Sequence, residues 1–394
     1  MTPEAGVWGR VREYAVPFVA FLVVATIMSK VQLSVAVHHA TGPYRSFTWA
    51  PTFTDMSGKL AWGAGDYRVI ATSGYPRGAG LEAAFPGFAL LIRYLAQVLD
   101  ARIETVETVS SLLSGLAATL LLWKWLLVRG IDRPARVAAL AVFLAFPYSF
   151  MIYGIGYNDV LLLPLVIGAF VLVETDRPVL AGLVGALATF TRPNAVALLP
   201  ALVVFELVTS GAIAPGRHLD LRRMGVRRWG VLLSAGGIAA YAAWLARHTG
   251  SPFTFLTAQQ SYGHLPLTNP NTLFKIGLYD NRNRVLGLGL VRWNHLLAAV
   301  VLVAAVALLP RLVRRLGWAY GAFAISLLAI TWVGTIGFAP AGRYLLPALP
   351  FYAGAIGDWL AAHRRVAVVL VIAFGALSLW LTVLFARTDI WLEW

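Results

Sequence analysis

Long apolar runs alternate with short polar connections along almost the whole chain. An α-helix needs roughly 20 apolar residues to cross a bilayer, so this pattern predicts a polytopic, all-α membrane protein. No segment between the runs is large enough to form a separate soluble domain, and we expect residues 1–394 to form one transmembrane domain. The eleven expected spans are residues 15–36, 106–128, 134–153, 157–173, 177–190, 193–209, 228–247, 294–309, 317–338, 343–361 and 365–386.

One further apolar segment, residues 83–98, is only 16 residues long, with Pro86 near its start and Arg93 in its middle. If this segment does not cross, the connections that hold sixteen of the 32 Lys and Arg residues all lie on one side. The short loops on the other side then hold only Arg192 and Arg343. Because basic residues concentrate in cytoplasmic loops, we expect 83–98 to be a re-entrant or interfacial helix.

This arrangement puts the N-terminal tail, residues 1–14, in the cytoplasm and the C-terminus on the outer face. Two long loops, residues 37–105 and 248–293, then lie outside. Both are longer than a connection between helices needs, and long loops in a compact fold usually carry function. We therefore expect the active site on the outer face.

Two helices in the middle of the chain are shorter than a bilayer is thick. The apolar run 160–173 has 14 residues and the run 179–190 has 12. Their outer ends must be recessed, which puts the polar turns at 153–159 and 191–194 below the outer surface. Polar backbone at that depth is tolerated only where it is buried in protein or lines water, so we expect an outward-facing polar crevice.

Composition agrees with this class of protein, since 59% of the residues are hydrophobic, 13% are charged and the mean hydropathy is +0.72. The net charge of +14 comes from arginine clusters between spans and not from one basic face. This distribution argues against nucleic-acid binding and favours contact with membrane lipids. The absence of cysteine excludes disulfides and thiolate chemistry. Arg outnumbers Lys, and Ala, Gly and Val are abundant, which indicates a high-GC bacterium and its plasma membrane.

The first outer loop concentrates polar, charged, glycine and aromatic residues between positions 55 and 88. Within it, Trp62, Tyr67, Ile70 and Ala71 recur at helical spacing and predict an amphipathic helix over 60–73 at the membrane surface. One carboxylate, Asp66, lies on this helix.

Five pieces of sequence follow one another along the chain. They are Trp62-x-Ala64-x-x-Tyr67-x-x-Ile70-Ala71-x-x-Gly74-Tyr75 with Ala84-Phe85-Pro86-Gly87-Phe88; Phe146-Pro147 with Ser149 and Tyr157-Asn158-Asp159; Thr191-Arg192-Pro193-Asn194; Thr249-Gly250-Ser251-Pro252 with Ala258-Gln259; and Arg343-Tyr344. Together they resemble the PIG-V family of polyprenyl- or dolichyl-phosphate-mannose-dependent mannosyltransferases. The resemblance implies a GT-C fold and mannosyl transfer. This family usually carries an acid directly after the tryptophan, and here that position is Gly63.

Transfer of a sugar from a lipid phosphate requires a base for the acceptor hydroxyl. Asp66 is our first candidate for that base and Asp55 the second, because Asp66 is one helical turn from the position of the family acid. The alternative is that Asp66 only caps or solvates its helix. If no carboxylate replaces the missing family acid, the protein is an inactive member with a scaffold role.

The same reaction requires cations for the departing phosphate. Arg192 and Arg343 lie at outer helix ends and are candidates for donor-phosphate binding, because guanidinium groups suit phosphate oxygens. We favour a structural ion pair of Arg192 with Asp159, although Asp159 is also a candidate for binding acceptor hydroxyls. Lys30 is a third candidate for phosphate contact, and snorkelling to the interface is its simpler explanation.

Several further polar and aromatic residues suit hydrogen bonding to, or stacking on, a sugar or acceptor. A plain surface loop is the alternative for those in the second outer loop. The two adjacent histidines, His38 and His39, do not share a helix face and lack a neighbouring acid cluster, so we expect no metal site. The candidates for acceptor or sugar contact are Trp62, Tyr67, Asn158, Asp159, Asn194, Gln259, Gln260 and His264.

The sequence has no P-loop or glycine-rich nucleotide cradle, which argues against a nucleotide-sugar donor. We expect an integral-membrane glycosyltransferase that takes mannose from a polyprenyl-phosphate donor, needs no other cofactor, and acts on a lipid or glycan acceptor. Transfer of another polyprenyl-linked sugar such as arabinofuranose is an alternative. A lipid transporter is an alternative of another class, against which stands the lack of repeated halves. The sequence does not identify a protein partner.

Overall fold

The computed structural model describes residues 3–38, 64–76, 79–213, 218–259, 290–334 and 341–387. Within these ranges every regular element is helical. Six helical stretches are long and apolar enough to cross a membrane: Arg12–Gln32, Ile103–Val128, Val226–Thr249, Leu296–Leu316, Ala341–Ala362 and Arg364–Val383. The chain is thus an all-α protein of the multi-pass membrane class.

The first half of the chain contains α1 (Pro3–His38), α3 (Ala64–Ser73), η2 (Leu81–Ala83), α4 (Pro86–Leu99), α5 (Ile103–Val128), α6 (Arg133–Ala145), η3 (Pro147–Ile152), α7 (Asn158–Glu174) and α8 (Pro178–Thr191). The second half contains η4 (Pro193–Ala197), α9 (Leu198–Thr209), η5 (Leu221–Arg223), η6 (Val226–Ala235), α10 (Gly236–Thr249), α11 (Thr254–Ala258), α15 (Leu290–Leu316), α16 (Trp318–Val333), α17 (Ala341–Tyr344), η8 (Leu346–Ala348), α18 (Leu349–Ala362) and α19 (Arg364–Arg387).

Each of the eleven expected spans corresponds to helical structure, but four of them are interrupted or change helix type. The span expected at 134–153 breaks at Phe146 before the 3-10 helix η3, and the span at 193–209 opens with η4. Pro147 and Pro193 are the first residues of these 3-10 segments, where the missing N–H of proline leaves no helical bond unmade. The span at 228–247 starts as η6, and the one at 343–361 is divided among α17, η8 and α18.

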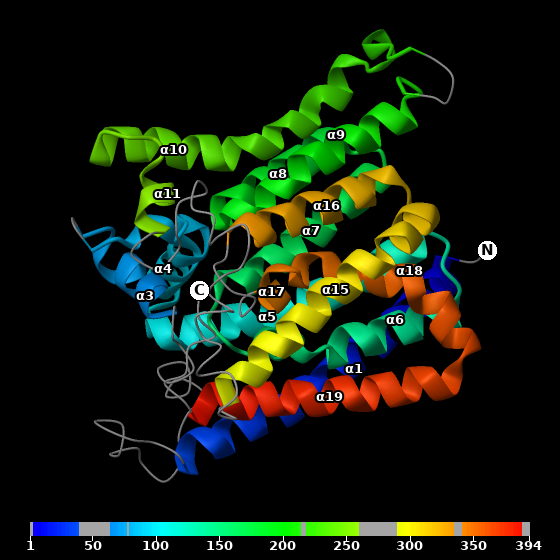
Figure 1. The fold of residues 1–394 in the computed structure, drawn as a ribbon, viewed down its shortest axis with the longest axis horizontal. Helices are drawn as coiled ribbons and strands as arrows, with labels where there is room; N and C mark the ends of the chain where they lie inside the picture. The colour runs from blue at the N-terminus through cyan, green and yellow to red at the C-terminus, as the bar shows by residue number, and fades with distance from the viewer. Residues whose placement is uncertain are drawn as a thin grey trace.

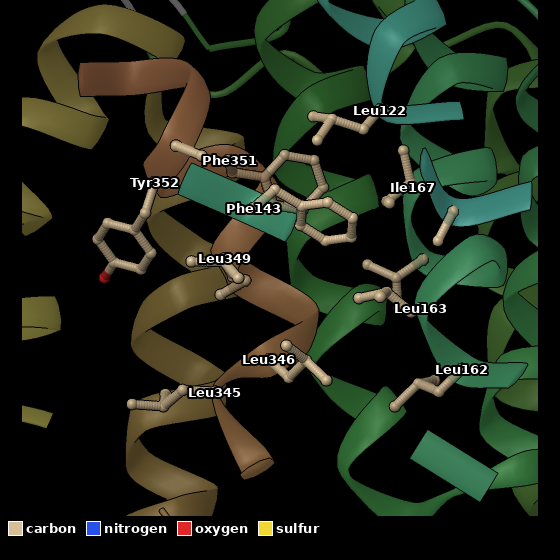
Figure 2. Packing of buried hydrophobic residues seen from close by; sticks show 14 of the residues in the cluster. Leu122, Phe143, Leu162, Leu163, Ile167, Leu345, Leu346, Leu349, Phe351 and Tyr352 are labelled. Atoms are coloured by element: carbon tan, nitrogen blue, oxygen red, sulfur yellow. The ribbon is translucent and has the colours of Figure 1, made fainter. Parts of the chain in front are cut away.

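The core lies between α5, α6, α7 and α18, which pack against one another along the middle of the bundle. Figure 2 shows Phe351 of α18 against Phe143 of α6, with Leu163 and Ile167 of α7 opposite them. These residues are almost fully buried. Helix α7 is buried nearly all round, which agrees with its continuous apolar sequence and with a central position.

The irregular segment between α6 and α7 is buried, and side chains satisfy its backbone carbonyls. From α1, Ser29 donates to the carbonyl of Tyr153 at 3.4 Å and Gln32 donates to that of Phe150 at 3.4 Å. From α5, Ser111 donates to the carbonyl of Ile155 at 2.6 Å. A chain that leaves helical geometry inside a bilayer needs such donors, because no water is present to replace them.

Helices α1 and α19 lie side by side and run in the same direction (Figure 1). The beginning of α1 and the end of α19 therefore lie at opposite ends of the bundle, as an odd number of passes requires. Helices α3, α4 and α11 gather at the end away from the start of α1 (Figure 1). Which of the two ends faces the cytoplasm stays a prediction.

Helix α4 is the segment expected to be re-entrant, and it begins at Pro86, three residues after the expected start. Its buried face, formed by Phe88, Ala89 and Ile92, packs against α3 and α5. Helix α3 was expected to lie on the membrane surface, but Tyr67, Ile70 and Ala71 are buried in the same cluster. These three residues of α3 thus pack against other helices, and whether α3 lies at the membrane surface stays a prediction.

Candidate functional site

A buried carboxylate with two guanidinium groups forms the centre of the candidate site. Asp159 Oδ2 makes an ion pair with Arg192 Nη1, and the Nε of Arg343 lies 3.8 Å from the same oxygen. All three residues are less than 10% exposed. Buried charges of this kind are costly unless they are paired, so their arrangement is a strong constraint on this part of the fold.

The buried turns that precede α7 and follow α8 bring these residues together. The Asn158 side chain, in the first turn of α7, donates to the carbonyl of Thr191 at 3.1 Å. The same side chain accepts a hydrogen bond from Arg192 Nη1 at 3.3 Å. Asn158 therefore ties the two turns to each other, and both turns are buried within the protein. Their depth in the membrane stays a prediction.

Aromatic rings hold the guanidinium groups in place. Arg343 lies over the ring of Tyr157 and over that of Tyr344, with its Cζ 5.3 Å from each centroid. Arg192 lies over Tyr344 as well, at 4.9 Å. Tyr344 is thus shared by two cations, and such contacts strengthen when water is excluded.

This cluster contains more cationic than anionic charge, because one carboxylate faces two guanidinium groups. Several of its polar atoms also lack a hydrogen-bond partner among the described residues. They are both side-chain amide atoms of Asn194, the Nε atoms of Arg192 and Arg343, and the two carboxylate oxygens of Asp159, whose contacts with the arginines are ionic. Buried polar groups are normally satisfied, so this concentration of unmade bonds suits a polar, anionic ligand.

Helix α3 lies over the cluster. Tyr67 is buried, packs edge-on against Phe88 with ring centroids 6.0 Å apart, and is followed by a half-buried Arg68. Burial raises the pKa of the Tyr67 phenol above its ordinary value, so it remains a protonated donor. The charged groups that act on this pKa are, in decreasing order of effect, Arg192, Asp159, Arg343 and Asp66. All three charged residues of the cluster act on Tyr67, and Asp66, half-buried in the first turn of α3, directly precedes it.

Helix α4 closes the same region from another side. A side chain at Gly87 would meet Thr191, with a Cβ only 2.6 Å from its Oγ1 and 2.9 Å from its Cα. The first turn of α4 therefore contacts the end of α8 directly, one residue before Arg192. Only glycine permits this approach without displacing the backbone.

The segment of η2 and the segment of α10 and α11 meet at an aromatic junction. Tyr241 of α10 donates to the carbonyl of Glu82 at 2.8 Å and packs against Phe85, with centroids 4.6 Å apart. Phe255 of α11 contacts Phe85 from the other side at 5.4 Å. Gln259, a candidate for acceptor contact, is half-buried at the end of α11, which packs against α10 and η2.

The structure brings together Asn158, Asp159, Arg192 and Arg343, and places Asp66 and Tyr67 beside them. Asn194 is buried two residues after Arg192. Lys30 is exposed on α1, whereas its neighbours Ser29 and Gln32 face the bundle. The remaining candidates, Asp55, Trp62, Gln260 and His264, lie outside the described residues, as does Gly63. Within the described ranges, no three His, Asp or Glu side chains form a group that would hold a metal ion.

Two kinds of residue in this region were not identified from the sequence. Tyr344 and Tyr157 belong to the motif pieces, but nothing in their spacing indicates that they flank arginines. Glu107 of α5, fully buried and bonded to Arg68 of α3 at 2.6 Å, looked like an ordinary acid at the start of a span. The sequence did contain one indication of its role: a charged carboxylate next to an apolar span is energetically costly unless it has a partner.

No protein-family model matches the chain, and no curated protein matches it. The crystal structure of the Archaeoglobus fulgidus oligosaccharyltransferase in complex with Zn and sulfate resembles it with a TM-score of 0.44 and 14% identity, covering 92% of this chain and 53% of that one. The archaeal oligosaccharyltransferase AglB from the same organism, in complex with an inhibitory peptide and a dolichol-phosphate, gives 0.39 and 12%, covering 94% and 55%. The chain spans about half the length of these structures. At such values the likeness carries no argument about substrate or activity.

Proposed function

We propose that the protein is a GT-C-type glycosyltransferase of the bacterial plasma membrane. In this proposal it transfers mannose from a polyprenyl-phosphate donor to a lipid or glycan acceptor at the outer face, with no further cofactor. The observation that carries the proposal is the buried cluster of Asp159, Arg192 and Arg343, where the start of α7 meets the end of α8. Its excess positive charge suits one phosphodiester, and its position inside a membrane domain suits a lipid-linked one.

In the reaction, the bond between the sugar C1 and the donor phosphate oxygen breaks, and a bond from the acceptor oxygen to C1 forms. The electron pair of the broken bond stays on the polyprenyl phosphate, which thereby gains negative charge. Arg192 and Arg343 stabilise that charge. The phenol of Tyr67 and the amide of Asn194 are the neutral donors that supply further hydrogen bonds there.

The acceptor hydroxyl loses its proton as the new bond forms, and Asp66 takes this proton in our proposal. Asp66 is half-buried beside the cluster, whereas Asp159 is fully buried and already paired with Arg192. An acceptor hydroxyl can reach a half-buried carboxylate more easily than one that is fully buried and held by an arginine. Asp159 is therefore assigned to holding the arginines and Asp66 to proton removal.

Binding of two lipids tests the proposal: polyprenyl phosphate and polyprenyl-phosphate mannose, each added to the purified protein in nanodiscs. Arg343→Gln is expected to weaken binding of both lipids by roughly ten- to a hundredfold, because a charge-assisted hydrogen bond contributes about 1.5–3 kcal/mol. Arg247→Gln is the matched control, since Arg247 is exposed in the last turn of α10. Equal affinity of the folded Arg343 variant and the control would contradict the assignment.

Asp159→Asn separates phosphate binding from a purely structural role. It removes the one carboxylate that competes with the ligand for both guanidinium groups, so donor affinity is expected to stay equal or increase. If Arg192 and Arg343 serve only to pair with Asp159, neither the Asp159→Asn variant nor the native protein binds the donor measurably. Donor binding without sugar transfer to any acceptor would instead favour the inactive scaffold or the lipid transporter.

A further inference from the structure

Helix α3 is held by a buried ion pair that the proposed reaction does not use. Arg68 Nε donates to Glu107 Oε2 at 2.6 Å, with the arginine side chain 18% exposed and the glutamate side chain fully buried. Arg68 lies two residues after Asp66, and Glu107 lies in the second turn of α5. This ion pair therefore connects the helix that carries the proposed base to a helix of the membrane domain.

The same glutamate also contacts the segment that leads to the phosphate cluster. A side chain at Gly156 would collide with the carboxyl group of Glu107, so this group lies directly against the Gly156 backbone. Asp159 follows three residues later. Glu107 is thus in contact both with α3 and with the turn that positions Asp159.

The ion pair and the apolar contact of Tyr67 together define the rotation of α3. Successive residues of a helix project about 100° apart. Tyr67 packs against Phe88 of α4, and Arg68 reaches Glu107 of α5 in a different direction. Two anchors at different angles prevent the short helix from rotating about its axis, which fixes the direction in which Asp66 projects.

We propose that Arg68 and Glu107 are positioning residues that hold Asp66 at a fixed place relative to the Asp159, Arg192 and Arg343 cluster. This inference rests on the proposed function. The ion pair touches neither donor nor acceptor in this scheme, so its loss lowers turnover and leaves donor affinity intact. A misplacement of about 1 Å can cost on the order of 10² in rate, and we expect Glu107→Gln to lower kcat by roughly ten- to a hundredfold.

Spin labels measure the position of α3 directly, and the chain contains no cysteine that would compete for labelling. Val69 of α3 and Leu113 of α5 are 40% and 60% exposed, so Val69→Cys and Leu113→Cys provide the label sites. Glu107→Gln and Arg68→Gln are expected to shift or broaden the distance distribution between the labels, and Arg68→Lys to restore part of it. Arg102→Gln is the control, because Arg102 and Glu104 form a more exposed ion pair at 3.8 Å near the start of α5.

The proposal holds if Glu107→Gln changes the label distances and lowers kcat at unchanged donor affinity, with Arg68→Lys intermediate in both. It is overturned if the label distances in Glu107→Gln match those of the Arg102→Gln control, whatever happens to kcat. It is equally overturned if donor affinity falls in parallel with kcat, since Glu107 would then act on the phosphate cluster. A native protein that transfers no sugar refutes the proposed function, while the distances still test how α3 is positioned.

Discussion

Asp66 is the residue on which the proposed chemistry depends most. Asp66→Asn preserves the size and the capping ability of the side chain but cannot accept the acceptor proton. We expect this variant to keep its fold and donor affinity, and to lower turnover by about 10²–10⁴, the usual contribution of general acid–base catalysis. The measurement is the single-turnover rate of sugar transfer at saturating donor.

Asp100→Asn is the matched control for this prediction. Asp100 ends α4 with a φ of 46°, a left-handed conformation that asparagine adopts as readily as aspartate. This control should transfer sugar at the native rate, and Asp55→Asn should lose less activity than Asp66→Asn. Normal turnover of Asp66→Asn, together with an inactive Asp55→Asn or Asp159→Asn, would show that another carboxylate is the base.

Sequence reasoning reached part of the candidate site at the level of single residues. The pairing of Asp159 with Arg192 followed from the cost of leaving either charge alone at a recessed helix end, and the structure contains this ion pair. The approach of Arg343 to the same carboxylate did not follow, because the two positions are 184 residues apart and no local pattern indicates such a contact. Glu107 was missed for the same reason, since its partner Arg68 lies on a different helix.

Helix α8 packs against η6 and α10 through glycines, and this contact tests the fold at the level of elements. A Cβ at Gly182 would collide with the carbonyl oxygen of Gly230, and one at Gly185 would lie 2.6 Å from Ser234 Cβ. Close approach of small residues is a common way for membrane helices to associate. We expect Gly182→Ala to destabilise the protein by about 1–3 kcal/mol, the usual cost of overpacking a close contact.

Gly168→Ala on α7 is the control for this prediction. A Cβ at Gly168 makes only ordinary contacts, at 3.8 Å to Leu121 and 3.9 Å to Val184. Alanine favours the helix over glycine by roughly 0.5–1 kcal/mol, so this variant should be as stable as the native protein or more so. Thermal unfolding in one detergent compares the two, and equal Tm values would mean that α8 tolerates a wider separation than the structure has.

The positions of the helices follow from the apolar pattern, but their interruptions do not. Hydropathy is insensitive to the break at Phe146 or to the change from η6 to α10, because the residues on both sides are apolar. The donors that make the first break possible, such as Ser29 and Gln32 of α1, are more than 100 residues away in the sequence. An irregular buried segment therefore depends on distant side chains that a local pattern does not reveal.

At the scale of the whole molecule, the same direction of α1 and α19 constrains the topology (Figure 1). Two membrane helices that run in the same direction are separated by an odd number of passes. If all eleven expected spans cross, α1 is the first pass, α19 is the eleventh, and nine passes lie between them.

Parallel neighbours need an odd number of passes between them, and nine passes satisfy this if α4 does not cross. If α4 crossed as well, ten passes would separate α1 from α19, and the two helices would run in opposite directions. Their common direction therefore favours the re-entrant or interfacial assignment of α4.

The orientation of the bundle is the last prediction. The connections at 129–136 and 210–228 hold eight basic residues and lie at the same end of the expected topology as the start of α1. Because basic loops are retained in the cytoplasm, we expect reporter tags inserted in both connections to be cytoplasmic, and a tag after Trp394 to be external. Protease protection in intact cells measures the side of each tag. An external tag at 129–136 with a cytoplasmic N-terminus would mean that α4 crosses the membrane. Asp66 of α3 would then lie on one side of the membrane, and Arg192 and Arg343 would lie on the other.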